Sequence, residues 1–476
     1  MSGALRPFAG LQGPRAWPLV GNALQMRTPE LHRRLEGWTA RYGPEYRLRV
    51  GQRDLLVVSD PALIATALRD RPVRFRRPIY SGRIAREMGF DEGLFFANDG
   101  VWQRQRRMVM AGFDPAHVKA YFPTLAKVAL RLRERWQRAA DTGTTIDLQA
   151  DLMRYTVDVI AGLAFGAEVD TLGSDQDVIQ RHLNRIFPAL FQRSLAPVRW
   201  WRYVKLPADR ALERSVVEVK AAIAGFIGEA RARLEDPARR ARPQNLLEAM
   251  IVAADEAGSG VDDRDVAGNV FVMLVAGEDT TANTLAWAIH LLHAHPEALQ
   301  RATSEALRIA PNPSAATHAQ VQELDYIEAC LHETMRLKPV APLIAAQAVA
   351  DTTLGDLEVP AETIVIGLLR HGTTRPENFP DPAAFRPERW LGGDGPGRAA
   401  SSAKRVSMPF GAGPRVCPGR YLALMEMKMA LAMLLASFSI ESVDTPDGAA
   451  PRELLNFAMG PSPIRMRLER RLPDGV

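Results

Sequence analysis

The feature that most constrains the fold is one very long apolar helix in the second half of the chain. Asp262 or Asp263 is a good N-cap, and the helical pattern continues to His295, before Pro296. About 33 residues at 1.5 Å each span roughly 50 Å. The centre, FVMLVAGEDTTANTLAW, is apolar nearly all round, which predicts a helix buried through the middle of the protein. The polar residues 278–281 at its midpoint need a reason to be there, because unpaired buried polar groups are costly.

The remaining pattern predicts a mainly α protein with minor β structure (α+β). We expect a helix at 29–42, two short strands in 45–59 with Gly51 at the turn, short strands at 345–368, a flexible loop at 391–403 and a helix at 419–437. Long helices are expected from 114 to 339, with breaks near Gly143, Gly173, Pro197, Pro237 and Pro311–Pro313. No boundary divides the chain, so residues 1–476 are expected to form one domain.

Composition excludes several classes of function. Sixty basic against fifty-five acidic residues give a net charge of +5, and the arginines are dispersed, so nucleic acid is a poor partner. No window approaches the roughly 18 apolar residues of a membrane-spanning helix. The N-terminus lacks a signal pattern. Two cysteines, Cys330 and Cys417, suit a reducing compartment. We therefore expect a soluble cytoplasmic protein.

Residues 410–419, FGAGPRVCPG, place a cysteine in an unusual setting. Gly411 and Gly413 allow a tight turn with positive φ. Arg415 can hold an anionic group. Cys417 stands just before a predicted helix, whose N-terminal N–H groups stabilise a thiolate. Gly419 would let that helix approach closely. Cys330 lacks such a setting and is expected in the core.

The pattern Phe-x-x-Gly-x-Arg-x-Cys-x-Gly resembles the haem-binding loop of the cytochrome P-450 superfamily, as in its stand-alone bacterial members. Three further motifs match in the family's order: WQRQR at 102–106, AGEDTT at 276–281, and HETMR at 332–336 followed by FRPERW at 385–390. The resemblance spans about residues 13–470 and implies the family's fold and a haem b cofactor.

The resemblance also implies roles for single residues. Cys417 is the expected iron ligand, Asp279 and Thr280 are expected to deliver protons during dioxygen activation, and a bulge near Gly277 would leave a groove for dioxygen. The remaining haem contacts are expected from Trp102, Arg106, Phe410, Arg415 and Gly419, and a buried cluster of Glu333, Arg336 and Arg389 is expected to brace the cysteine loop.

Two positions depart from the family pattern. Gln347 stands where many members have a propionate-binding arginine, and a neutral amide would make a weaker contact. Trp390 stands where phenylalanine is common, and we expect little functional consequence.

The implied reaction is monooxygenation of a lipophilic small molecule. The chain has no flavin or nicotinamide motif, so a separate donor is implied, such as a ferredoxin or flavodoxin-type protein with an NAD(P)H reductase. A basic face for that donor is expected at Arg104, Arg107, Lys404, Arg405 and Arg420.

Family analogy outlines an apolar pocket. Its expected lining is Phe90, Leu94, Phe95, Phe96, Phe187, Phe191, Phe271, Val275, Ala276, Val340, Leu343, Ile344 and Phe457. Residues 193–205 interleave aromatic and basic residues, and either touch a membrane surface through Trp200 and Trp201 or pack those rings in a solvated loop.

Two other functions compete. A peroxide-driven or rearranging haem-thiolate enzyme often lacks an acid–alcohol pair, so Asp279 and Thr280 argue against it. A non-catalytic haem protein that binds a ligand is the third possibility, and no signalling segment supports it.

Overall fold

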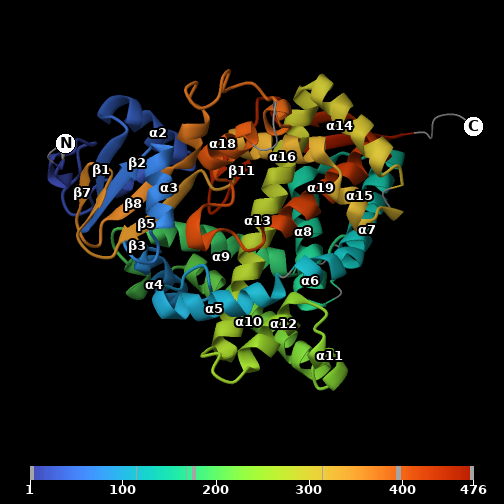
Figure 1. Ribbon diagram of the computed structural model, residues 1–476, viewed down its shortest axis with the longest axis horizontal. Coiled ribbons are helices and arrows are strands. Elements are labelled where there is room, and N and C mark those ends of the chain that lie inside the picture. Colours follow the sequence, from blue (N-terminus) through green and yellow to red (C-terminus); the bar gives the residue numbers. More distant parts are fainter. Residues whose placement is uncertain are drawn as a thin grey trace, which may run out of the picture.

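The long helix is present as predicted and crosses the centre of the molecule as α13, Asp263–Ala294 (Figure 1). Asp262 caps it by accepting hydrogen bonds from the backbone N–H groups of Arg264 and Asp265, at 2.9 and 3.1 Å. The Asp265 carboxylate in turn accepts a hydrogen bond from the Asp262 N–H, which completes a capping box. Most side chains from Val266 to Leu292 are buried, so the helix forms the core around which the other helices pack.

The computed structural model describes residues 5–113, 115–167, 169–173, 178–312, 315–392 and 398–471. The other α-helices are α1 (Ala23–Met26), α2 (Leu31–Tyr42), α3 (Pro61–Arg69), α4 (Ile79–Glu87), α5 (Asp99–Gly112), α6 (Pro115–Ala120), α7 (Phe122–Thr142), α8 (Leu148–Phe165), α9 (Val178–Leu195), α10 (Pro207–Arg233), α11 (Pro237–Ala241), α12 (Leu246–Asp255), α14 (Pro296–Ile309), α15 (His318–Gln322), α16 (Asp325–Leu337), α17 (Leu369–Thr373), α18 (Arg398–Ser407) and α19 (Arg420–Ser437).

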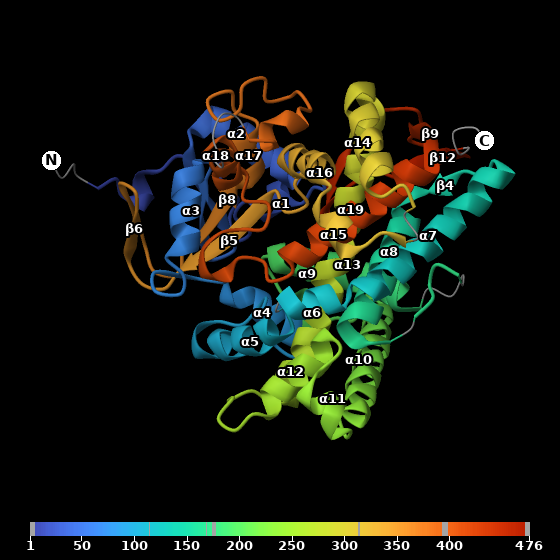
Figure 2. The same cartoon turned by 45° about the vertical axis from the view of Figure 1, so that its right-hand side comes forward.

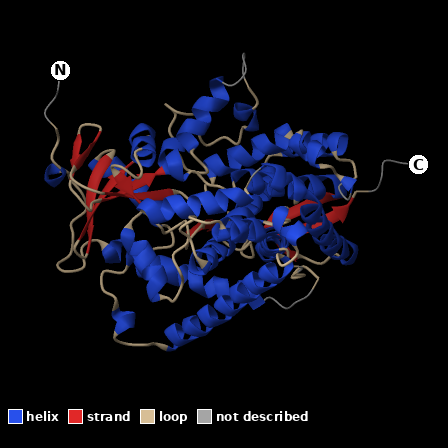
Figure 3. Cartoon of the chain, turned by 60° about the horizontal axis from the view of Figure 1, so that its bottom comes forward, coloured by secondary structure: helices blue, strands red, loops and turns tan. Residues whose placement is uncertain are grey.

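The strands are short and gather at two sides of the helical body (Figure 3). They are β1 (Glu45–Val50), β2 (Arg53–Val58), β3 (Phe75–Arg76), β4 (Ile146–Asp147), β5 (Leu343–Ala348), β6 (Thr352–Leu354), β7 (Leu357–Val359), β8 (Ile364–Leu368), β9 (Phe438–Asp444), β10 (Glu453–Leu455), β11 (Met459–Pro461) and β12 (Arg465–Arg470). The main sheet has the order β1-β2-β8-β5-β3, in which only β2 and β8 run parallel. The predicted pair of strands at 45–59 is its antiparallel edge hairpin.

Helices α3 and α2 pack on opposite faces of the main sheet. Most of the other helices lie to one side of the sheet, with α8 and α19 beside α13 and the pair α9–α10 packed together (Figure 2). A close backbone contact fixes the loop before α5 against α13. A Cβ on Gly93 would lie 2.3 Å from the Gly268 carbonyl oxygen, so no other residue fits there. The Asn269 side chain accepts a hydrogen bond from the Leu94 N–H at 2.9 Å. The loop that carries Phe95 and Phe96 is therefore held directly on the central helix.

A buried carboxylate ties the β10–β11 hairpin to the rest of the molecule. Glu453 is fully buried and accepts hydrogen bonds from His32 and Arg33, both at 2.9 Å, and from Lys338 at 2.6 Å. Arg370 lies 3.4 Å away. Burial alone would raise the pKa of Glu453, but the bonds from His32 and Arg33 hold it well below its usual range. One anion thus joins β10 to α2, α17 and the end of α16.

One predicted segment is wrong in part. The loop expected at 391–403 ends at residue 397, because α18 begins at Arg398. Alanines favour a helix once the preceding glycines and proline are passed, and Ala403 is buried against Phe379 and Trp390. Residues 393–397 of that segment, and Pro313 among the expected breaks, lie outside the described residues. Among the described helices, none combines the length and apolar character needed to cross a bilayer.

Candidate functional site

Residues 410–419 form a tight turn between α18 and α19. The Cys417 N–H donates to the Phe410 carbonyl at 3.0 Å, which closes the turn. Gly411 and Gly413 have φ of 74° and 71°, as predicted. A Cβ on Gly413 would lie 2.5 Å from the Leu68 carbonyl oxygen, so the turn packs directly against the end of α3.

Cys417 is half-buried, three residues before α19. Burial raises the pKa of its thiol, while a hydrogen bond from the Gly419 N–H and the charges of Arg106 and Arg420 lower it. Burial has the larger effect, so the pKa of Cys417 is raised overall, and a metal ion that binds this sulfur would have to displace its proton. Cys330 is fully buried in the core, as expected, and burial raises the pKa of its thiol.

Gly419 is the N-cap of α19, but close packing does not explain the glycine. A Cβ there would come no nearer than 3.7 Å to Phe113, an ordinary contact. No described protein atom therefore requires a glycine at 419, and the expectation that Gly419 permits a close helix approach stays a prediction. Its contribution is the N–H group directed at the Cys417 sulfur.

Three arginines converge beside the turn without a carboxylate partner. The guanidinium groups of Arg71, Arg77 and Arg415 donate only to neutral oxygens, at 2.7–3.4 Å, and form no salt bridge with a described residue. Burial and the charges of Arg77, Arg71 and Arg106 lower the pKa of Arg415 to about 8. Burial and Arg77 lower the pKa of Arg71 to about 9, and burial lowers that of Arg77 to about 10.

Buried cations that repel one another need a buried anion. The two propionates of a haem supply that charge in a form that guanidinium groups bind well. The residues present therefore fit the expected cofactor, with the thiol of Cys417 and this arginine cluster in one site.

Helix α5 contributes the two residues expected from its motif. Trp102 is buried, and the Arg415 guanidinium lies over its ring, 5.1 Å from the centroid. Arg106 is half-buried, and burial lowers the pKa of Arg106 while the Cys417 sulfur raises it. Both residues thus lie on the side of α5 that faces the cysteine turn.

Asn98, which the sequence did not single out, joins the arginines. Its Oδ1 accepts from the Arg77 N–H at 2.9 Å and from the Arg415 guanidinium at 3.2 Å. Its Nδ2 donates to the Arg77 carbonyl at 3.0 Å. Arg77 stands in the run FRRPIY, where neither spacing nor neighbouring residues distinguish it from the arginines beside it.

Gln347 uses its amide on the protein itself. Its Oε1 accepts from the Ile79 N–H at 3.0 Å, and its Nε2 donates to the backbone carbonyl and carboxylate of Glu362 at 3.1 and 3.0 Å. Gln347 thus anchors Ile79, which lies two residues after Arg77. Gln347 itself is neutral, and Arg77 is the positively charged side chain of this segment in the arginine cluster.

The expected bracing cluster is present and well bonded. Arg336 makes a two-pronged contact with Glu333, with both N–O distances at 2.8 Å, and both side chains are fully buried. Arg389 reaches the same carboxylate at 3.3 Å. Arg336 also donates to three carbonyls of the segment before 385–390, those of Thr373, Pro382 and Ala384. The cluster fastens α16 to that segment.

Trp390, for which little functional consequence is expected, takes part in this cluster structurally. Its indole Nε1 donates to the Glu333 carboxylate at 2.9 Å, which phenylalanine cannot do. The Arg386 N–H donates to the other carboxylate oxygen at 3.0 Å. His332 stacks on the Trp390 ring, 5.1 Å between centroids.

The middle of α13 is polar on one side. Ala276 is exposed and Thr280 half-exposed, whereas Val275, Glu278 and Thr281 are buried. The Thr280 hydroxyl donates to the Ala276 carbonyl at 2.6 Å. The helix continues without a break through Gly277, so the expected bulge is not seen. Gly277 faces Ile160 of α8, whose Cδ1 would lie 2.6 Å from an added Cβ.

Asp279 is held by two neighbours. Asn283 donates to its carboxylate at 2.9 Å and to its backbone carbonyl at 2.8 Å. Burial raises the pKa of Asp279 to about 6, against the bonds from Asn283 and the Ala458 N–H, which lower it. Ala458 lies in the turn between β10 and β11, so this hairpin reaches the central helix. Gly460 packs there too, because a Cβ on it would lie 2.3 Å from Asn283 Oδ1.

Aromatic side chains from three segments meet beside this turn. Phe457 lies 6.2 Å from Phe95 and 5.7 Å from Phe187, between ring centroids. The Arg77 guanidinium lies 4.0 Å from the Phe95 centroid. The other expected lining residues divide by burial. The buried ones are Leu94, Phe96, Phe271 and Val275, and Phe271 stacks on Phe90. The half-buried ones are Val340, Leu343 and Ile344, while Phe191 packs beside the main sheet.

The two tryptophans at 200–201 differ. Trp200 is 43% exposed, while Trp201 is 4% exposed. The Trp201 indole donates to Glu87 at 3.3 Å, and the Arg193 guanidinium lies 4.9 Å from its ring. The expectation that both rings could reach a membrane is therefore wrong for Trp201.

Comparison with known proteins agrees with this arrangement. The family model for Cytochrome P450 matches residues 11–468. The chain is 27% identical to "Cytochrome P450 3A6" of Oryctolagus cuniculus, over 91% of this chain and 86% of the relative. It is 29% identical to "Carotene epsilon-monooxygenase, chloroplastic" of Arabidopsis thaliana, over 85% of this chain and 76% of the relative.

A solved structure, "Crystal structure of cytochrome P450DA heme domain", superposes with a TM-score of 0.82 and covers 99% of both chains at 24% identity, which supports the fold. With a family match over nearly the whole length, and a cysteine turn, arginine cluster and central helix arranged around one site, the chain belongs to the cytochrome P450 family, whose cofactor is haem b.

Proposed function

We propose that this P450 monooxygenase inserts one atom of dioxygen into a lipophilic small molecule and takes electrons from a separate protein. The observation that carries the proposal is the joint presence of the Cys417 turn, the unpaired arginine cluster and the Asp279–Thr280 pair on the central helix. Each of these three features alone could serve only to stabilise the fold, but together they are what a haem-thiolate site requires.

Haem would be held by Cys417 at the iron and by Arg71, Arg77, Arg106 and Arg415 at the propionates. When bound, haem supplies dioxygen activation, and a thiolate ligand favours cleavage of the O–O bond. The protein lowers the cost of the thiolate through the Gly419 N–H group.

The proton supply is assigned to Asp279 and Thr280. The Thr280 hydroxyl lies on the exposed side of α13, beside Ala276, where it can pass a proton by turning from the Ala276 carbonyl. Asp279 has a pKa of about 6, so it can gain and lose a proton near neutral pH. Asn283 keeps the carboxylate in place.

The substrate site is assigned to the aromatic group of Phe95, Phe187 and Phe457, together with the exposed Ala276 of α13. These rings favour a lipophilic substrate because they offer apolar surface and no hydrogen-bond partner.

The electron donor is proposed to dock on exposed cations near α5, α18 and α19. Arg107, Lys404 and Arg405 are exposed, and Arg420 stacks on Tyr421. Arg104 is a weaker candidate, because it donates to the Gly260 carbonyl at 2.8 Å. An acidic ferredoxin or flavodoxin-type protein fits this face, and electron transfer should slow as salt rises.

The test has a spectral and a kinetic part. The reduced protein with carbon monoxide should show the red-shifted Soret band of a thiolate ligand, and Cys417→Ser should lose it. With a surrogate reductase, apolar substrates should stimulate NADPH use and yield oxygenated product. Turnover with peroxide alone, or isomerisation without reductant, would assign the protein to the competing haem-thiolate class.

Thr280→Ala should keep haem and NADPH use but divert electrons from product to peroxide. Thr284→Ala is the matched control, because its hydroxyl makes the same kind of bond, to the Thr280 carbonyl at 2.8 Å, one turn further along α13. Equal product yield per NADPH in both variants would remove Thr280 from the proton path.

A further inference from the structure

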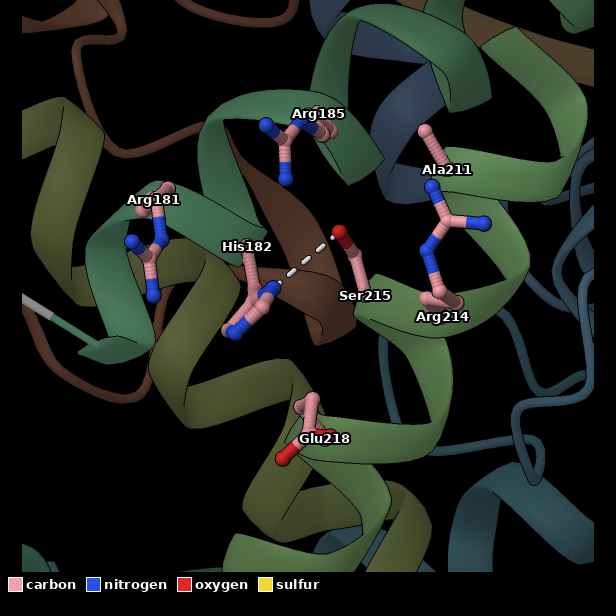
Figure 4. Close-up of a pocket in the computed structure, with 7 residues that line it drawn as sticks. All are labelled: Arg181, His182, Arg185, Ala211, Arg214, Ser215 and Glu218. Atoms are coloured by element: carbon pink, nitrogen blue, oxygen red, sulfur yellow. Dashed lines mark hydrogen bonds between the residues drawn. The ribbon is translucent and has the colours of Figure 1, made fainter. Parts of the chain in front are cut away.

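A cationic cleft lies between α9 and α10, apart from the site described above. It has a volume of about 370 Å³. Its polar lining consists of Arg181, His182 and Arg185 from α9 and Arg214, Ser215 and Glu218 from α10. Figure 4 shows the three guanidinium groups placed around the His182–Ser215 pair on three sides, with Glu218 further along α10.

The cleft has a polar floor. The Ser215 side chain is fully buried, and its hydroxyl lies 3.1 Å from His182 Nδ1. Burial and the charge of Arg181 lower the pKa of His182, while Glu218 raises it. The two helices therefore meet through a hydrogen bond rather than through apolar packing at this point.

The rim carries more positive than negative charge. Arg181, Arg185 and Arg214 are exposed, and none makes a hydrogen bond or salt bridge with a described residue. At the other end of the same helix pair, Arg193 lies 2.7 Å from the Asp209 carboxylate. Among the described lining residues, three guanidinium groups face one carboxylate, that of Glu218, which is a local excess of two positive charges.

We propose that this cleft binds the phosphate group of a small soluble molecule. Guanidinium groups are planar and present paired donors, which match the oxygens of a phosphate. Three of them approaching from three sides suit a compact anion of charge near two. A water molecule occupies about 30 Å³ in the liquid, so the cleft has room for a phosphate with part of the molecule attached to it.

A soluble ligand fits better than a lipid headgroup. The exposed aromatic side chains of this region, Trp200 and Tyr203, follow the C-terminal end of α9. The cleft involves the first turns of α9, and His182 lies about 20 Å along the helix axis from Leu195. The exposed aromatic rings that could enter a bilayer therefore lie well away from the cleft.

The consequence for the enzyme is a further link between α9 and α10, in addition to the His182–Ser215 and Arg193–Asp209 contacts. Phe187 lies five residues after His182 and two after Arg185 on α9, and it packs against Phe457 in the proposed substrate site. A bound phosphate would join α9 to α10 at the cleft, so it would restrain the helix that carries Phe187.

Calorimetric titration with inorganic phosphate tests the proposal, using the haem-loaded protein at constant ionic strength. Saturable binding at one site is expected. Arg181→Gln, Arg185→Gln and Arg214→Gln should each weaken it on the order of tenfold, as expected for loss of one charge-assisted bond. Arg308→Gln, which removes an exposed arginine from α14, is the matched control and should bind like the parent protein.

Absence of saturable binding, or equal affinity in the three variants and the control, would overturn the proposal. A vesicle arm separates the two sources of phosphate. Binding to phosphatidic acid vesicles that depends on the three arginines, without binding of inorganic phosphate, would also overturn it in favour of a lipid headgroup. Neither arm uses turnover, so failure here leaves the proposed function intact. Melting curves and far-UV circular dichroism check that the variants fold.

Discussion

Replacing Trp390 by phenylalanine gives a sharp test of the buried Glu333 cluster. The change keeps an aromatic ring but removes one donor from a fully buried carboxylate, a bond of 2.9 Å. Four donors remain, from Arg336, Arg386 and Arg389. A hydrogen bond to a charged group contributes about 1.5–3 kcal/mol, so the variant should lose that amount of unfolding free energy.

Trp287→Phe is the matched control. Trp287 is 1% exposed and lies beside a histidine ring, as Trp390 does, but its indole N–H has no acceptor among the described residues. The two changes remove similar volume, and only one removes a hydrogen bond. Trp287 also carries the Lys338 ammonium over its ring, 4.7 Å from the centroid, a contact that a phenylalanine ring can keep. The difference between the two variants therefore reports mainly the bond to Glu333.

Guanidinium unfolding, followed by far-UV circular dichroism and by the Soret band, measures both variants. Trp390→Phe should lower the midpoint clearly more than Trp287→Phe does. In a Glu333→Gln background the excess loss should shrink, because the indole would then face a neutral amide. An equal loss in both tryptophan variants would refute the reasoning.

Three further outcomes are expected. Asn283→Ala removes a donor to the Asp279 carboxylate, so the inflection near pH 6 in the pH profile of turnover should move up by about one pH unit. An unmoved inflection would mean that Asp279 is not the group that titrates there. Arg77→Gln should speed transfer of haem to apomyoglobin about tenfold, because one charge-assisted contact is lost, and an unchanged rate would exclude a propionate contact. If residues 193–205 touch a membrane, Trp200→Ala should reduce vesicle binding, whereas Trp201→Ala should lower thermal stability because its ring is buried.

Sequence reasoning succeeded where the determining contacts are local. The capped helix at 263–294, the hairpin at 45–58 and the Glu333–Arg336 pair each depend on spacing within one element, and all three are present. The turn glycines Gly411 and Gly413 were predictable because their φ values leave few alternatives.

Contacts between distant segments were not predictable in this way. Arg77 is positioned by two hydrogen bonds: its own N–H donates to Asn98, and the Ile79 N–H donates to Gln347. Both bonds join parts of the chain that are far apart in sequence. The Ala458 N–H that donates to Asp279 is a backbone group, so almost any residue at 458 could supply it and the residue type does not predict the contact. The expected bulge at Gly277 came from the family pattern rather than from this chain's own residues.

The hairpin β10–β11 has a consequence for the order in which the enzyme is made. The central helix and the cysteine turn leave the ribosome before the residues that complete them, since Ala458 and the Glu453 anchor follow Cys417 by roughly forty residues, or about 2–8 s of synthesis. During that interval the turn can already meet haem, but Asp279 lacks its backbone donor and Phe187 lacks its aromatic neighbour. We therefore expect cofactor loading to be possible before the surroundings of Asp279 are complete, and the β10–β11 hairpin completes them.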